Sequence, residues 1–126
     1  MTILIVDDDA GIRELVSLFL THKGYAVVAA HNGMEALAYL EQHKPFPELI
    51  LLDLMMPVMD GATFRQAQLD APQLADIPVV VMSAAENIQA QASTLVAQAY
   101  LPKPIDFEAL VQLVEQYCSQ SRQQGR

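Results

Sequence analysis

Acidic, hydroxyl and amine side chains follow four short apolar runs of this chain. These side chains are Asp7, Asp8 and Asp9 after the first run, then Asp53, Ser83 and Lys103 after later runs. The runs are typical of strands in a parallel sheet, and the carboxyl ends of parallel strands share one edge. In open α/β sheets that edge holds the ligand site, so these groups are expected to meet there.

The chemistry of such a cluster follows from its charges. Carboxylates brought close together repel one another and favour protonation unless a cation offsets them. Mg²⁺ prefers oxygen ligands and is usually held by one or two carboxylates together with phosphate oxygens. A lysine and a hydroxyl can stabilise a transferring phosphoryl group, and a carboxylate can accept that group as an acyl phosphate. The pattern predicts phosphoryl chemistry with Mg²⁺ (or Mn²⁺), and Asp53 is the candidate nucleophile.

The elements that position these groups alternate along the chain. Nearly continuous apolar runs at 2–6, 25–30, 49–52, 77–82 and 99–101 predict strands buried on both faces. Helical stripes lie between and after them: Ile12, Leu15, Val16 and Phe19; Met34, Leu37 and Leu40; Phe64, Ala67 and Gln68; a faint stripe in 84–96; and Phe107, Leu110, Val111, Val114 and Tyr117. Gly24 and Pro45 are placed to end the first two helices.

This alternation predicts a doubly wound α/β fold, with a five-stranded parallel sheet flanked by five helices. We expect one domain over residues 1–118, followed by a polar tail over 119–126. The tail is too short for an output domain, and no repeat or linker is evident.

Composition excludes several classes of function. The chain has 126 residues and a formal net charge of −8, so direct nucleic-acid binding through Lys and Arg is not expected. No apolar run approaches the roughly 20 residues that span a bilayer, and the start has no signal-peptide pattern. The single cysteine, Cys118, fits a reducing compartment. These features predict a cytoplasmic protein with no membrane partner.

Four motifs together resemble the response-regulator receiver domain of two-component signalling, in its single-domain, chemotaxis-regulator-like form. They are ILIVDDD at 3–9, LILLDLMMPVMDG at 49–61, VVVMSA at 79–84 and YLPKP at 100–104. The likeness runs from Thr2 to about Tyr117. It implies a flavodoxin-like sheet with strand order 2-1-3-4-5.

The resemblance also implies a role for each matching residue. Asp53 matches the phosphoacceptor. The metal would be held by Asp8, Asp53 and the backbone carbonyl of Met55, with Asp7 acting through water. Ser83 and Lys103 match the groups that contact the phosphoryl, Ser83 and Tyr100 match the switch pair, and Pro104 matches a proline that follows a cis peptide bond.

The implied function is a phosphorylation-activated switch rather than an enzyme. A histidine kinase or phosphotransfer protein would donate the phosphoryl group, and the signal would pass through the fourth helix, the fifth strand and the fifth helix. Three positions bear on how closely the chain follows the family. Val96 replaces a glycine usual before the switch aromatic, and the side chains of Met55 and Ala85, which tune dephosphorylation, are neither acid nor amide.

Other interpretations remain open at this point. Asp9 fits the N-cap of the first helix better than a metal site, Ser83 could cap the fourth helix, and Tyr100 could be a core aromatic. A degenerate receiver could act only as a docking scaffold. An aspartyl-nucleophile phosphohydrolase would need a second aspartate that Asp53-Leu54-Met55 lacks. A flavodoxin-type cofactor would be repelled by the three aspartates after the first run.

Overall fold

The protein is one parallel sheet with helices on both faces. The computed structural model describes residues 1–124, and side chains for residues 1–118. The strands are β1 (Thr2–Val6), β2 (Ala26–Ala30), β3 (Leu49–Asp53), β4 (Val79–Ser83) and β5 (Ala99–Pro102). The helices are α1 (Ala10–His22), α2 (Gly33–Gln42), α3 (Gly61–Asp70), α4 (Ile88–Thr94) and α5 (Phe107–Gln124).

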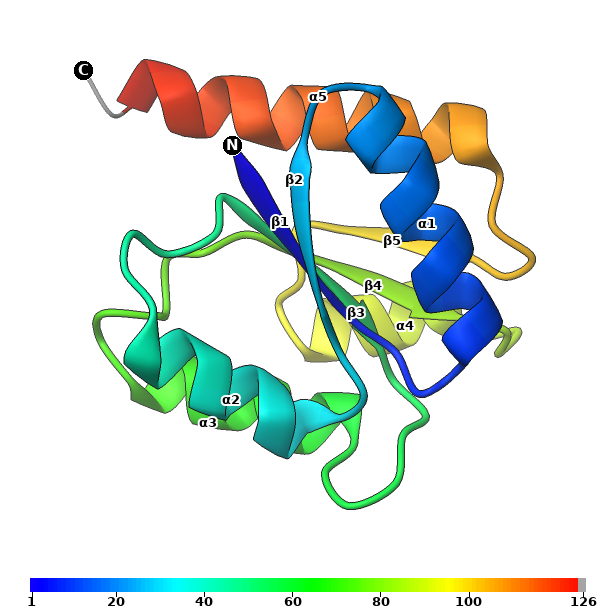
Figure 1. The fold of residues 1–126 in the computed structure, drawn as a ribbon. Helices are drawn as coiled ribbons and strands as arrows, with labels where there is room; N and C mark the ends of the chain where they lie inside the picture. Colours follow the sequence, from blue (N-terminus) through cyan, green and yellow to red (C-terminus); the bar gives the residue numbers. More distant parts are fainter. Residues whose placement is uncertain (125–126) are drawn as a thin grey trace.

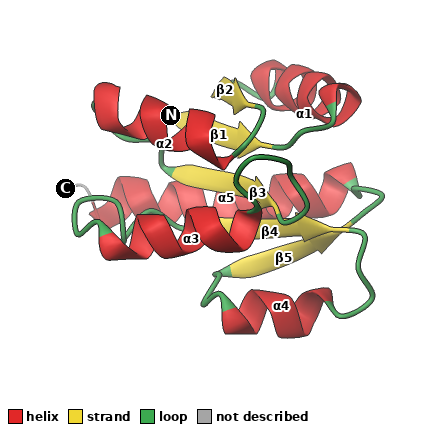
Figure 2. Cartoon of the chain, turned by 90° about the horizontal axis from the view of Figure 1, so that it is seen from below, coloured by secondary structure: helices red, strands yellow, loops and turns green. Residues whose placement is uncertain are grey.

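The strand order is β2-β1-β3-β4-β5, and every neighbouring pair is parallel. Helices α1 and α5 cover one face, and α2, α3 and α4 cover the other (Figure 1). Seen from below, the strands fan out from β2 at one edge to β5 at the other (Figure 2). The predicted doubly wound fold and its strand order are confirmed.

Two apolar cores follow from this layering, one on each face of the sheet. Alternate residues of each strand point to opposite faces, so Leu4 packs with the α2, α3 and α4 side while Ile5 packs with the α1 and α5 side. Strands β3 and β4 are buried along their whole length. The prediction that all five runs are buried on both faces was wrong for the edge strands β2 and β5, which are partly exposed because each has one neighbour.

Four helices begin at side-chain caps, and for α5 the cap is Asp106, whose carboxylate accepts from the Glu108 and Ala109 N–H groups. The Asp9 carboxylate accepts hydrogen bonds from the backbone N–H groups of Gly11 and Ile12, which confirms it as the N-cap of α1. Asn32 and Asp60 cap α2 and α3 in the same way. Helix α4 begins at Ile88 rather than near residue 84, so the alternative in which Ser83 caps it was wrong.

Other predictions about the helices need correction or stay open. Leu15 and Met34, placed on apolar stripes, are more than half exposed. Helix α5 continues to Gln124, and the side chains of the predicted tail, 119–126, lie outside those described, so the domain division stays a prediction. Among the described residues, no helix combines the length and hydropathy needed to cross a bilayer.

Candidate functional site

Three carboxylates meet where β1 and β3 end. Asp7, Asp8 and Asp53 each place one carboxylate oxygen within 4.8 Å of the others. Because β1 and β3 are direct neighbours in register, Val6 against Leu52, the residues that follow them are brought side by side. Asp7 is fully buried and Asp53 nearly so, while Asp8 is exposed to solvent.

Lys103, which follows β5, reaches across to this cluster. Its Nζ lies 3.0 Å from Asp7 Oδ2 and 3.3 Å from Asp53 Oδ1. Burial works against the ammonium charge, but the hydrogen bond to Asp7 and the charges of both carboxylates outweigh it and raise the pKa of Lys103. The amine therefore stays protonated and holds the two carboxylates together.

The negative charge of the Asp53 carboxylate is unfavourable in the folded protein. Burial, followed by the nearby charge of Asp7, raises the pKa of Asp53 to about 6, although Lys103 and the Met55 N–H oppose the shift. One ammonium does not neutralise the three carboxylates. The donor set of three carboxylates at the carboxyl edge of the sheet fits a hard divalent cation, which would lower the repulsion further.

Backbone and side-chain contacts hold Asp7 in place. Its Oδ1 accepts a hydrogen bond of 2.9 Å from the Asp9 N–H, and its N–H donates to the Ala30 carbonyl at 3.1 Å. Arg13 donates from Nη1 to the Asp7 carbonyl at 2.8 Å. Sequence reasoning missed Arg13, because only its place on the first turns of α1 beside the acidic loop could have indicated it.

The remaining predicted residues border the cluster. Ser83 is buried as the last residue of β4, and its Oγ accepts a hydrogen bond from the Ala85 N–H at 3.1 Å. The Met55 N–H donates to Asp53 Oδ1 at 3.3 Å, and its side chain is exposed. Tyr100 on β5 is 37% exposed, which excludes the core-aromatic alternative. The peptide bond between Lys103 and Pro104 is cis, as the resemblance implied.

Comparison with known proteins gives one consistent result. Residues 3–115 match the model of the response regulator receiver domain. The response regulator MprA of Mycobacterium avium is 38% identical over 114 residues, a match that takes in 88% of this chain and 48% of MprA. The chain thus spans about half the length of the curated relative.

Solved structures agree with the sequence matches. The chemotaxis protein CheY4 of Vibrio cholerae superposes with a TM-score of 0.82 at 30% identity, covering 92% of this chain and 97% of CheY4. The response regulator TrrA of Thermotoga maritima, in complex with Mg²⁺ and BeF, has a TM-score of 0.80 at 28% identity, with 92% and 97% covered. The likeness therefore extends over nearly the whole of each compared chain.

Proposed function

Because the chain belongs to the response regulator receiver domain family of two-component signalling, we propose that Asp53 is the residue that accepts the phosphoryl group. The observation that carries this assignment is the placement of a buried carboxylate at the end of β3, 3.3 Å from the Lys103 ammonium and beside Asp7 and Asp8. Asp7 has similar neighbours, but both of its carboxylate oxygens accept hydrogen bonds, from the Asp9 N–H and from Lys103, whereas both described contacts of the Asp53 carboxylate use Oδ1.

The geometry suggests how each group takes part. An Asp53 carboxylate oxygen would bond to phosphorus while the bond from phosphorus to the donor breaks and its electron pair leaves with the donor. Lys103, whose Nζ lies 3.3 Å from Asp53 Oδ1, and Ser83, at the end of β4, would bind the phosphoryl oxygens. Asp8, Asp53, the Met55 carbonyl and, through water, Asp7 would hold Mg²⁺, which supplies positive charge to the phosphoryl oxygens.

The partners follow from this chemistry. We assign the donor as a histidine kinase or phosphotransfer protein, and the output surface as α4, β5 and α5, where Tyr100 is exposed. The negative charge of the chain argues against direct nucleic-acid binding by this domain. A cytoplasmic location accords with the single cysteine and with the described helices, none of which could cross a membrane.

Incubation with acetyl phosphate and Mg²⁺ tests the assignment. Intact-mass measurement should show the gain of one phosphoryl group in the wild-type protein and none in Asp53→Asn, which removes the nucleophilic carboxylate. Asp9→Asn is the matched control, because Asp9 caps α1 and should leave the gain unchanged. An unmodified wild type would contradict the proposal and favour a docking scaffold. A gain that survives in Asp53→Asn would contradict it by showing that another residue is modified.

We expect the phosphoryl group on Asp53 to be hydrolysed slowly. Neither Met55, two residues after Asp53, nor Ala85, two after Ser83, carries an acid or amide that could orient an attacking water. Loss of the phosphoryl mass in Mg²⁺ should therefore be slow, and Met55→Gln should accelerate it. A half-life of only seconds for the wild-type protein would refute this prediction.

A further inference from the structure

A buried arginine without a carboxylate partner lies on α3. Arg65 is 2% exposed, and within residues 1–118 no acidic side chain lies at ion-pair distance from it. Burying an arginine is costly unless its donors are satisfied, so its contacts define what the residue does.

The guanidinium is satisfied mainly by the end of α4. Its Nε donates to the Leu95 carbonyl at 3.0 Å and its Nη2 donates to the Val96 carbonyl at 2.8 Å. Leu95 is the C-cap of α4, where carbonyls lack partners within the helix and a cation is favoured. Nη1 donates to Gln68 Oε1 at 2.7 Å, and Gln68 in turn donates to the Leu74 and Ile77 carbonyls.

The turn that Arg65 holds is conformationally costly. Val96 has a φ of 56°, in the left-handed region that a β-branched residue rarely adopts. Such a conformation persists only where surrounding contacts impose it. After the turn, the Gln98 N–H donates to the Val79 carbonyl, and the Val79 N–H donates to Gln98 Oε1. The turn is therefore fixed between Arg65 on one side and β4 on the other.

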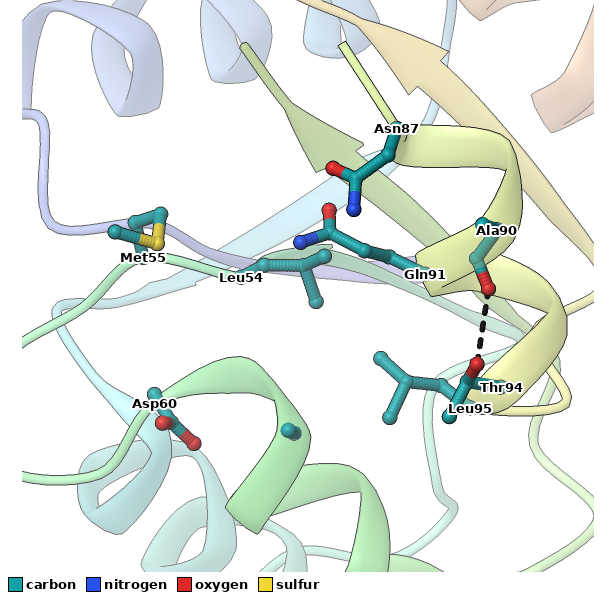
Figure 3. Close-up of a pocket in the computed structure, with 9 residues that line it drawn as sticks. Leu54, Met55, Asp60, Asn87, Ala90, Gln91, Thr94 and Leu95 are labelled. Atoms are coloured by element: carbon teal, nitrogen blue, oxygen red, sulfur yellow. Dashed lines mark hydrogen bonds between the residues drawn. The ribbon is translucent and has the colours of Figure 1, made fainter. Parts of the chain in front are cut away.

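The other end of α4 is held less firmly. A cavity of about 350 Å³ lies between the start of α3 and α4, and on the α4 side its lining runs from Asn87 and Gln91 to Thr94 and Leu95 (Figure 3). Asn87 makes no side-chain capping bond, and the buried Gln91 Oε1 has no hydrogen-bond partner. Among the described side chains, both hydrogen bonds that join α3 to residues 88–98 come from Arg65.

The first residue of α3 contacts the end of β3, the strand that carries Asp53. The Gly61 N–H donates to the Leu54 carbonyl at 3.1 Å, and a Cβ at Gly61 would lie 2.6 Å from the Asp53 carbonyl oxygen. Arg65 follows Gly61 by about one helical turn. Helix α3 thus contacts the end of β3 at its first residue and the α4–β5 turn one turn later.

We propose that Arg65 is a positioning residue that couples the end of β3, through α3, to the α4–β5 turn. This route runs through the hydrogen bond from Gly61 to Leu54 and those from Arg65 to Leu95 and Val96, and none of these bonds involves Ser83 or Tyr100. The regulatory part of this proposal, that phosphorylation acts on the turn through α3, rests on the proposed role of Asp53. The mechanical part, that Arg65 fixes the turn, rests on the hydrogen bonds of Arg65 alone.

Hydrogen exchange of the backbone amides of residues 95–98 tests the mechanical part. Arg65→Met replaces the guanidinium with an unbranched apolar side chain, and Gln66→Met, on the exposed side of the same helix, is the matched control. Exchange at 95–98 should rise by about ten-fold or more in Arg65→Met, beyond any rise in β1 and β3, and should stay at the wild-type rate in Gln66→Met. Should Arg65→Met not fold, Arg65→Lys keeps the charge but has one donor nitrogen in place of three, and exchange at 95–98 should still rise above the wild-type rate.

Beryllofluoride with Mg²⁺, as a phosphoryl mimic, tests the coupling. In wild type its binding should change exchange at 95–98, and in Arg65→Met that change should fall to about half or less although fluorine NMR still reports the bound mimic. An unaltered rate at 95–98 in Arg65→Met, or an equal response in both proteins, would overturn the proposal. Absence of bound mimic in wild type would contradict the role of Asp53 instead, and the exchange rates without mimic would still decide whether Arg65 fixes the turn.

Discussion

Replacing Asp53 by asparagine should stabilise the metal-free protein near neutral pH by roughly 2–3 kcal/mol, even though it removes the proposed phosphoacceptor. Burial and the charge of Asp7 raise the pKa of Asp53 to about 6, so the folded state carries an unfavourable charge at neutral pH. Asparagine has nearly the same shape without that charge. Urea unfolding in the presence of a chelator measures the difference.

The sign of the pH dependence follows from the same shift. The pKa of Asp53 in the folded state lies above its ordinary value of 3.8, so between these two values the folded state binds a proton that the unfolded state does not. Wild-type stability from this group should therefore rise as the pH falls through about 6 towards 4. The advantage of Asp53→Asn should shrink over the same range and vanish below it, because the carboxyl is then neutral in both states.

Asp60→Asn is the control, because the pKa of Asp60 is shifted in the opposite direction from that of Asp53. The Thr63 N–H lowers the pKa of Asp60, so the charged form is favoured in the folded state and its removal should not stabilise the protein. Adding Mg²⁺ should stabilise wild type more than Asp53→Asn, since a carboxylate has been lost from the proposed metal site. An Asp53→Asn protein no more stable than wild type near neutral pH would contradict the electrostatic description of the site.

Gly61→Ala should destabilise the protein by about 2–3 kcal/mol, because the new methyl group would overlap backbone atoms that cannot move independently. Its Cβ would lie 2.6 Å from the Asp53 carbonyl oxygen and 2.8 Å from Leu54 Cα. The helix can relax only by moving away from the end of β3, which should also reduce phosphorylation by acetyl phosphate. Urea unfolding and the rate of mass gain measure the two effects.

Two other glycines provide a graded control series. At Gly33 the added Cβ would meet the Met59 side chain, which is flexible, so the cost should be smaller. At Gly11 the nearest atom is Asp9 Oδ1 at 3.2 Å, and the change should stay within about 0.5 kcal/mol. If Gly61→Ala were as mild as Gly11→Ala, the close packing of α3 against the end of β3 would be refuted.

Much of the fold could be read from local patterns. The run at 2–6 coincides with β1, because Thr2 and the four apolar residues after it are followed directly by three aspartates, which fix where the strand ends. Four of the predicted site residues, Asp7, Asp8, Asp53 and Lys103, are brought together because parallel strands end at one edge. The strand order came from the family resemblance, since periodicity predicts elements and not their neighbours.

What could not be predicted depends on tertiary contacts. The start of α4 at Ile88 was misplaced because Ala84 and Ala85 are good helix formers that nonetheless continue the loop after β4. The burial of Arg65 was also invisible in the sequence, because an arginine beside apolar helix positions is normally exposed. The carbonyls of Leu95 and Val96, about thirty residues away, together with Gln68 Oε1, make its buried position tolerable.

The parallel sheet has a practical consequence for how the molecule can be attached to a solid support. Met1 precedes β1, and α5 runs back antiparallel to the strands, so the start of the chain and the end of α5 both lie away from the edge that bears Asp53 (Figure 1). Attachment to the support through either the start of the chain or the end of α5 should leave the edge that bears Asp53 exposed to the solution. Sensor-chip measurements of phosphoryl-donor binding should therefore give the same affinity whichever end is anchored.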